Sequence, residues 1–204
     1  MKQSKETSSS GTIHRASAKQ AQILETGKSL FSKHGTKRVS IEEICREAGV
    51  SKMTFYRYYP NKNELIKAVL ILMLDESMMA YRELMARDIS FKAKMEEIVR
   101  LKFESTDSVS EEFAKDIYIN GAAEIKALYQ ELAGKIMQEV IGHYQEAQAQ
   151  GWIRADIKPG FIMYMMEAMR DQYFDEKLRA MYPNINDLAV ELNHFLYYGL
   201  GLKE

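Results

Sequence analysis

Cysteine is almost absent from this sequence, and its scarcity limits the compartments in which the protein is expected to work. Cys45 is the one cysteine among 204 residues, so an intramolecular disulfide framework is excluded. Its place within an amphipathic pattern predicts a small buried apolar group. We therefore expect a protein of a reducing, cytoplasmic environment.

Long apolar runs are also missing. The most apolar stretch, residues 68–74, is too short to cross a bilayer and is followed at once by Asp75 and Glu76. Residues 1–14 contain lysines and serines without a continuous apolar segment, so they predict a disordered tail and not a signal peptide. The sequence predicts no membrane partner.

Proline is rare, and no segment shows the alternation typical of a strand. Prolines occur only at positions 60, 159 and 183, and between them apolar residues recur at spacings of three and four. The predicted fold class is therefore all-α. Helices are expected over residues 18–34, 41–48, 52–59, 62–87, 91–104, 110–120, 122–150, 161–174 and 187–200.

Capping residues and a glycine outline two short helices in the first third of the chain. Ser40 with Glu43 is a capping box, which starts one helix, and Gly49 ends it. Ser51 caps the next helix, which Pro60 prevents from continuing. Two short helices joined by a tight turn that contains glycine predict a helix-turn-helix.

Charge is unevenly distributed, although the formal net charge is only −1. Residues 1–62 hold twelve Lys/Arg and five Asp/Glu, a net charge of +7, whereas residues 63–204 hold sixteen and twenty-four, a net charge of −8. A basic first part suits a polyanionic partner, because lysine and arginine displace the counterions condensed on phosphates. A solvated basic surface is the alternative interpretation.

The most specific motifs lie between residues 35 and 65. They are the helix ending LFSKHG at 30–35, Thr36, the Ser40 cap, the turn AGVS at 48–51, the run FYRYYPNK at 55–62 and the helix that starts at Glu64. From roughly Arg15 to Leu65, the chain closely resembles the DNA-binding domain of the TetR family. Two positions depart from the family pattern: Met53 stands where glycine is common, and Gly27 where alanine is usual.

The resemblance implies how the chain is organised. A tail, residues 1–14, would precede a helix-turn-helix DNA-binding domain, residues 15–62, and a larger helical effector-binding and dimerisation domain, residues 63–204. It also implies a ligand-responsive transcription regulator. We expect a repressor that binds a palindromic double-stranded operator as a homodimer and is released by a small-molecule effector, with activation as an open alternative.

The recognition helix would place its first residues in the major groove while flanking groups hold phosphates. Base-edge contacts are expected from Lys52, Met53, Thr54 and Tyr56, with Arg57 and Tyr58 nearer the groove walls. Phosphate contacts are expected from Thr36, Ser40, Tyr59 and Lys62, and Ser51 joins the DNA-binding set at the helix cap. A structural interpretation stays open for Thr36 and Ser40 as loop and cap residues, and for Tyr59 as a packing residue.

The second part of the chain carries weaker signals. The run 161–174 and the segment 187–200 are rich in apolar residues, so we expect these two C-terminal helices to form the dimer interface. Many methionines predict an adaptable interior that either accepts an apolar effector or merely fills the core. Polar or aromatic groups that could line a pocket are Tyr118, Asn120, Glu124, His143, Tyr144 and Arg170, and none is assigned as an effector contact.

An enzyme is the first rival interpretation, and the sequence gives it no support. The four histidines are far apart, Cys45 has no local catalytic context and no glycine-rich phosphate loop occurs, so no catalytic residue, metal site or cofactor is expected. The second rival is a helical interaction protein of the same fold that lacks sequence-specific DNA binding. The polar residues at the expected contact positions, Lys52 and Tyr56 among them, argue against it.

Overall fold

The computed structural model describes residues 17–106, 109–172, 175–182 and 184–201, and this part of the chain is helical without a strand. The predicted all-α fold class is confirmed. The first four helices are α1 (Ala18–His34), α2 (Ile41–Glu47), α3 (Lys52–Tyr58) and α4 (Lys62–Met85). The others are α5 (Phe91–Thr106), α6 (Glu111–Tyr118), α7 (Ala123–Ala149), α8 (Pro159–Gln172), α9 (Glu176–Arg179) and α10 (Ile185–Leu200). The predicted tail, residues 1–14, lies outside the described residues.

Capping side chains set the helix starts where the sequence predicts them. Ser40 accepts a hydrogen bond from the Glu43 amide at 3.1 Å, and Ser51 accepts one from the Thr54 amide at the same distance. α9 is the helix that the apolar spacing did not predict. It has only four residues, too few for a periodic stripe, and it begins where the Asp175 carboxylate accepts from the Leu178 amide at 2.8 Å.

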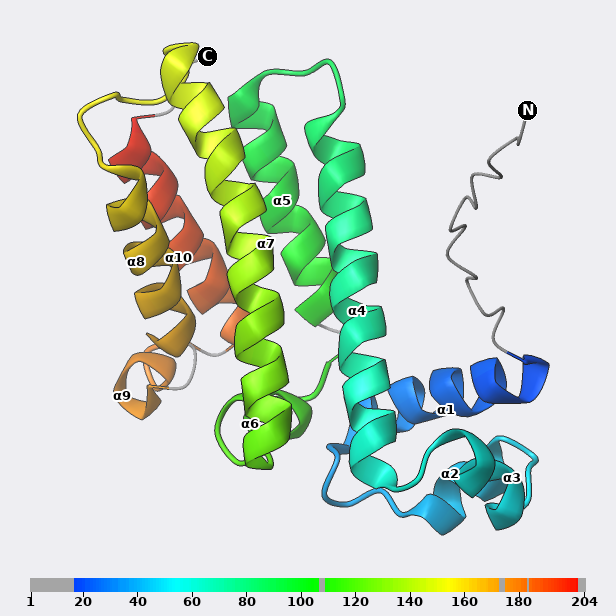
Figure 1. The fold of residues 1–204 in the computed structure, drawn as a ribbon. Helices are drawn as coiled ribbons and strands as arrows, with labels where there is room; N and C mark the ends of the chain where they lie inside the picture. The colour runs from blue at the N-terminus through cyan, green and yellow to red at the C-terminus, as the bar shows by residue number, and fades with distance from the viewer. Residues whose placement is uncertain (1–16, 107–108, 173–174, 183, 202–204) are drawn as a thin grey trace, which may run out of the picture.

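The first three helices and the start of α4 form a compact head at one end of the molecule (Figure 1). Phe31, Ile44 and Phe55 each contribute a fully buried side chain to its core. α1 approaches α4 closely at Gly27, where a Cβ atom would come within 2.9 Å of Leu65 Cδ2. Glycine at this position therefore lets the two helices pack without displacing a buried leucine.

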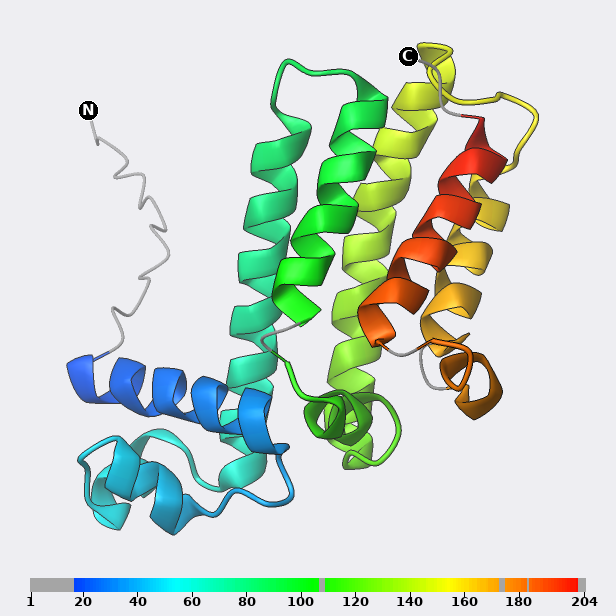
Figure 2. The same cartoon turned by 180° about the vertical axis from the view of Figure 1, so that it is seen from behind.

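The remaining helices form the body, in which α4 runs beside α5 and α7 (Figure 1). α8 and α10 pack on each other and against α7 and α5 respectively, as the view from behind shows (Figure 2). α6 lies at the base of the body and contacts both α1 and α7. The body is thus joined to the head by α4 along the chain and by α6 through space.

Two groups of buried apolar side chains stabilise this arrangement. The first contains the head core together with Phe113 and Ile117 of α6 and Ile125 of α7. The second joins α5, α7, α8 and α10 around Met95 and Tyr144. The domain boundary between residues 62 and 63 stays a prediction. Buried apolar side chains from both sides of it belong to the first of these two groups.

Candidate DNA interface and effector pocket

α3 is held against the head by one buried aromatic side chain. Phe55 is completely buried, and its ring lies edge-to-face with Tyr56 and also contacts Tyr59, at centroid distances of 5.5 and 5.9 Å. This anchor fixes the rotation of the helix about its axis. The opposite side of α3 therefore faces solvent.

The exposed side of α3 carries most of the expected base contacts. Met53 is 78% exposed and Tyr56 is 50% exposed, and Lys52 and Arg57 are also exposed. Thr54 is half-buried, with its Oγ1 3.0 Å from the Ser51 Oγ. Tyr58 is half-buried and packs against the head core. The structure thus brings Lys52, Met53, Tyr56 and Arg57 together on one solvent-facing surface.

Three residues expected to bind phosphates are engaged inside the protein. The Lys62 ammonium donates to the carbonyl oxygens of Thr36 and Val39 at 2.8 and 3.0 Å. The Thr36 hydroxyl is buried and donates to Asp116 Oδ2 at 2.9 Å. Tyr59 is 5% exposed, and its burial raises the pKa of its hydroxyl.

These contacts favour the structural interpretation of Thr36 and Tyr59, and they give Lys62 a role that the sequence did not suggest. Lys62 ties the start of α4 to the loop between α1 and α2. Because its donors are directed to two carbonyl oxygens, its contact to DNA stays a prediction that the geometry does not support. Ser40 is exposed and remains available at the α2 cap.

The sequence interpretation passed over two basic residues beside Ser40. Lys37 and Arg38 lie in the loop between α1 and α2, and both are exposed. Their signal was an adjacent pair of cations two residues before the capping Ser40, a pattern that suits phosphate contacts at the edge of a groove.

α6 is connected to the head by a buried carboxylate. Asp116 accepts hydrogen bonds from the Thr36 hydroxyl and from the Lys37 amide, at 2.9 and 3.0 Å, and lies 3.9 Å from the Lys37 ammonium. The Ser110 amide, before α6, donates to the Ser32 carbonyl at 2.7 Å. Gly35 has φ +76°, and a Cβ atom there would approach Asp116 Oδ2 to 3.1 Å. α6 and the end of α1 therefore form a close, hydrogen-bonded contact.

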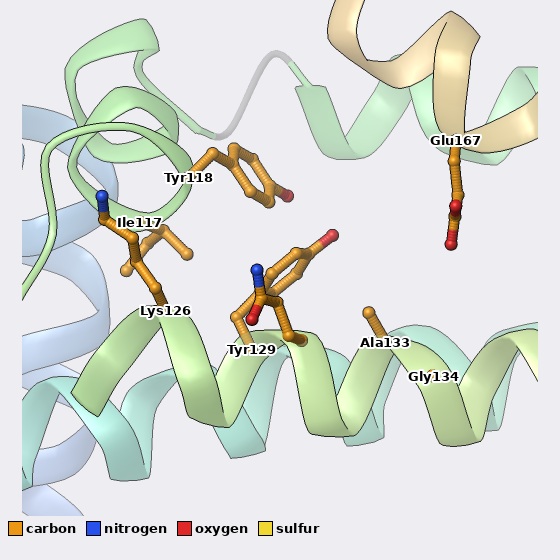
Figure 3. A pocket seen from close by; sticks show the side chains of 8 residues that line it. Ile117, Tyr118, Lys126, Tyr129, Ala133, Gly134 and Glu167 are labelled. Atoms are coloured by element: carbon orange, nitrogen blue, oxygen red, sulfur yellow. The ribbon is translucent and has the colours of Figure 1, made fainter. Parts of the chain in front are cut away.

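A pocket of about 430 Å³ opens beside the same helix, between α6, α7 and α8 (Figure 3). The residues that line it are Ile117, Tyr118, Lys126, Tyr129, Gln130, Ala133, Gly134 and Glu167. The Tyr118 and Tyr129 rings meet edge-to-face at 4.7 Å, and Glu167 of α8 faces them across the space. The volume of the pocket lies within the range of small-molecule sites.

The pocket was not predictable from sequence, since its walls come from residues up to fifty positions apart. Among the polar candidates whose side chains the structure describes, Tyr118 alone lines the pocket. Other candidates have internal partners: Glu124 accepts from Asn63 Nδ2 at 2.9 Å, and His143 Nδ1 lies 3.0 Å from the Tyr81 hydroxyl. The Arg170 side chain lies outside the described part of the structure.

A second surface of the body is rich in exposed aromatic side chains. Phe161 and Tyr164 of α8 and Phe195 and Tyr198 of α10 are all more than half exposed, and Tyr198 reaches 81%. Exposed aromatic side chains on two adjacent helices are typical of a protein-protein interface.

Other kinds of site find no support in the described residues. No group of three or more histidine, cysteine, aspartate or glutamate side chains there is arranged to hold a metal ion. None of the described helices is long and apolar enough to cross a membrane.

A basic head with an exposed recognition helix, joined to a helical body that contains a pocket, defines the class of helix-turn-helix transcription regulators. A family model described as bacterial regulatory proteins, tetR family, matches residues 23–69. The transcriptional regulator RutR of Escherichia coli strain K12 is 30% identical over 166 residues, which are 78% of this chain and 75% of RutR. The chain belongs to the TetR family, as the sequence predicted.

Solved structures of lower identity share the fold. The regulator FadR from Bacillus subtilis, in complex with stearoyl-CoA, has a TM-score of 0.68 at 15% identity and covers 86% of this chain and 96% of its own. A putative transcriptional regulator from Saccharomonospora viridis, in complex with choline, has a TM-score of 0.70 at 19% identity and covers 90% and 97%. Both likenesses confirm the predicted helical architecture.

Proposed function

We propose that this protein is a cytoplasmic, ligand-responsive transcriptional repressor that binds a palindromic operator as a homodimer and is released by a small-molecule effector. The observation that carries the proposal is the solvent-facing surface of α3, where Lys52, Met53, Tyr56 and Arg57 are presented by a helix anchored through Phe55. Membership of the TetR family supports a position of this surface in the major groove.

DNA contacts in this proposal divide into two kinds. Lys52, Met53, Thr54 and Tyr56 meet base edges, and the Met53 side chain suits the methyl group of thymine. Arg57 and Tyr58 lie near the groove walls. Phosphates are bound at the rim by Ser40, Ser51, Lys37 and Arg38, while Thr36, Tyr59 and Lys62 support the loop from within.

The homodimer forms through α8 and α10. Phe161, Tyr164, Phe195 and Tyr198 are exposed in a single protomer, and the pairing of two such surfaces removes them from water. The two recognition helices then reach successive major grooves, about 34 Å apart. Each protomer reads one half-site.

The effector binds in the pocket between α6, α7 and α8. The pocket offers two phenol rings together with the ammonium of Lys126, the amide of Gln130 and the carboxylate of Glu167. This set suits a small, planar, polar molecule that stacks on the rings and forms hydrogen bonds at its edges. Stearoyl-CoA and choline in the related folds are chemically unlike each other, so the ligand class is argued from this pocket alone.

Coupling between the two sites follows from α6. Ile117 and Tyr118 line the pocket, and the residue before them, Asp116, holds the loop at Thr36 and Lys37. An effector that draws this turn of α6 toward α7 and α8 pulls on the head and tilts α4. The spacing of the recognition helices changes, and the effector must bind this altered state more tightly, typically by ~1–3 kcal/mol.

The first experiment selects sequences from a random pool of DNA duplexes with the purified protein at a stated moderate salt concentration. Enrichment of a palindrome with half-sites about one helical turn apart supports the proposal. Tyr56→Ala is the variant control, because it removes an exposed side chain of α3 and should reduce enrichment. An unenriched pool with wild-type protein would overturn the DNA-binding proposal and favour the interaction protein.

A promoter reporter carrying the selected palindrome separates repression from activation. Lower expression in the presence of the protein, relieved by a compound that binds the pocket, is the expected result. Higher expression would replace the repressor with an activator and leave operator binding intact.

A further inference from the structure

An ion pair links the two helices of the helix-turn-helix on its exposed side. The Lys52 ammonium, at the first residue of α3, donates to the Glu42 carboxylate in the first turn of α2. The two side chains are 55% and 61% exposed. The pair therefore belongs to the surface on which the expected base contacts lie.

Both partners are charged at neutral pH. The hydrogen bond with Lys52 lowers the pKa of Glu42, and the same bond with Glu42 raises the pKa of Lys52. Lys52 is thus one of twelve cations in a region of net charge +7, but its charge is already balanced by a neighbouring carboxylate.

This balance affects non-specific and specific DNA binding differently. Non-specific affinity comes from cations that replace counterions on phosphates. Lys52 can contribute to it only by breaking its ion pair with Glu42. The Glu42 carboxylate is then left unpaired beside the negatively charged DNA. At the right base pair, lysine donates to guanine, and this bond offsets the loss of the bond with Glu42.

We propose that Glu42 is a selectivity-determining residue, which restrains Lys52 and thereby weakens binding to DNA of the wrong sequence more than binding to the operator. The inference rests on the proposed function, since it assumes that α3 enters the major groove. It assigns a role to an acidic residue on a surface otherwise expected to bind through cations and neutral donors.

The test is a double-mutant cycle measured on two duplexes, the palindrome enriched from the random pool and a scrambled duplex of the same length and composition. Glu42→Gln removes the carboxylate and is measured alone and together with Lys52→Met. Glu47→Gln is the matched control, because it makes the same charge change on an exposed glutamate of α2 that pairs with Arg46 instead. Dissociation constants are measured by fluorescence anisotropy over a series of salt concentrations.

We expect Glu42→Gln to tighten binding to the scrambled duplex by about 3- to 5-fold more than Glu47→Gln does, within the range of an exposed ion pair. Binding to the palindrome should tighten less, so that the ratio of the two dissociation constants falls. In the Lys52→Met background, Glu42→Gln and Glu47→Gln should have equal effects. Urea midpoints of all variants check that the fold is retained.

Equal effects of Glu42→Gln and Glu47→Gln in the wild-type background overturn the inference, because the carboxylate then acts only through net charge. A larger effect of Glu42→Gln that persists with Lys52→Met also overturns it, since Lys52 is then not the group restrained. These outcomes leave the proposed function intact provided that the wild-type protein prefers the palindrome. Absence of duplex binding by the wild-type protein contradicts the proposed function itself, and the inference with it.

Discussion

The head and the body of this protein differ in the sequence range of the contacts that place the side chains of their candidate sites. In the head, caps such as Ser40 and Ser51 bond to residues three positions away. In the body, the residues that line the pocket come from positions up to fifty apart, and an ion pair of Arg82 on α4 with Glu139 on α7 joins distant helices. The difference teaches that a DNA-reading surface can be recognised from a short segment, whereas an effector site cannot.

α6 does not follow this division. It belongs to the body by its place in the chain, yet Phe113 and Ile117 are buried in the same core as the head, and Asp116 bonds to the loop before α2. An element that shares its core with one region and lines the pocket of the other is placed to transmit a change between them.

Phe55→Ala should have the largest effect, because it empties a fully buried site in the core of the head. We expect a loss of about 3–5 kcal/mol in the free energy of unfolding, with loss of DNA binding. Urea unfolding followed by circular dichroism measures it. Met53→Ala, on the exposed side of the same helix, is the control and should change stability by less than about 0.5 kcal/mol. A similar stability loss in both variants would contradict the buried anchor.

Phe195→Asp combined with Tyr198→Asp should prevent the proposed dimer while leaving the fold of each protomer intact, because both side chains are exposed on α10. Loss of aromatic anchors typically weakens an interface by about 2–4 kcal/mol each. Sedimentation equilibrium should show a monomer, and operator affinity should fall. Ile89→Asp, in the exposed loop between α4 and α5, is the control and should remain dimeric. A dimeric double variant would place the interface elsewhere.

Asp116→Asn should loosen the contact between α6 and the head. Removal of the charge weakens the hydrogen bonds from the Thr36 hydroxyl and the Lys37 amide, at a cost of about 1–3 kcal/mol in the free energy of unfolding. Combination with Thr36→Val should be less than additive, because the two residues share a bond. Asp75→Asn, an exposed carboxylate of α4, is the control. If the stability losses of Asp116→Asn and Thr36→Val add fully in the double variant, the hydrogen bond between these two residues contributes nothing to stability.

Glu111→Gln should have the smallest effect, present near neutral pH and lost in acid. Hydrogen bonds from Arg179 and Lys115 lower the pKa of Glu111 from 4.5 to about 2. A carboxylate whose pKa is depressed by folding contributes stability above its unfolded pKa and loses that contribution as pH falls through its folded pKa. The difference between wild-type and variant urea midpoints should therefore shrink from pH 5 to pH 2. The control is Glu112→Gln, at the exposed neighbouring glutamate. A difference for Glu111→Gln that does not change with pH would falsify the lowered pKa of Glu111.

Local chemistry made the head predictable to within a few residues. The caps Ser40 and Ser51, the glycine that ends α2 and the proline after α3 each act over about one helical turn, and the structure places the helices accordingly. Exposure of Met53 and Tyr56 was also expected, since Phe55 between them is the apolar residue that must face the core. The direction of the Lys62 side chain was not expected from the sequence, because its two carbonyl partners lie more than twenty positions earlier in the chain.

By itself, the sequence determined the helical fold class, the helix starts and the surface expected to meet DNA, since each depends on hydrogen bonds and apolar spacing within a few residues. The packing of α6 with the head, the meeting of Tyr118 with Tyr129 in a pocket that Glu167 also lines, and the pairing of Lys52 with Glu42 became visible with the tertiary structure alone. These contacts join residues from ten to eighty positions apart, and their approach depends on how whole helices pack.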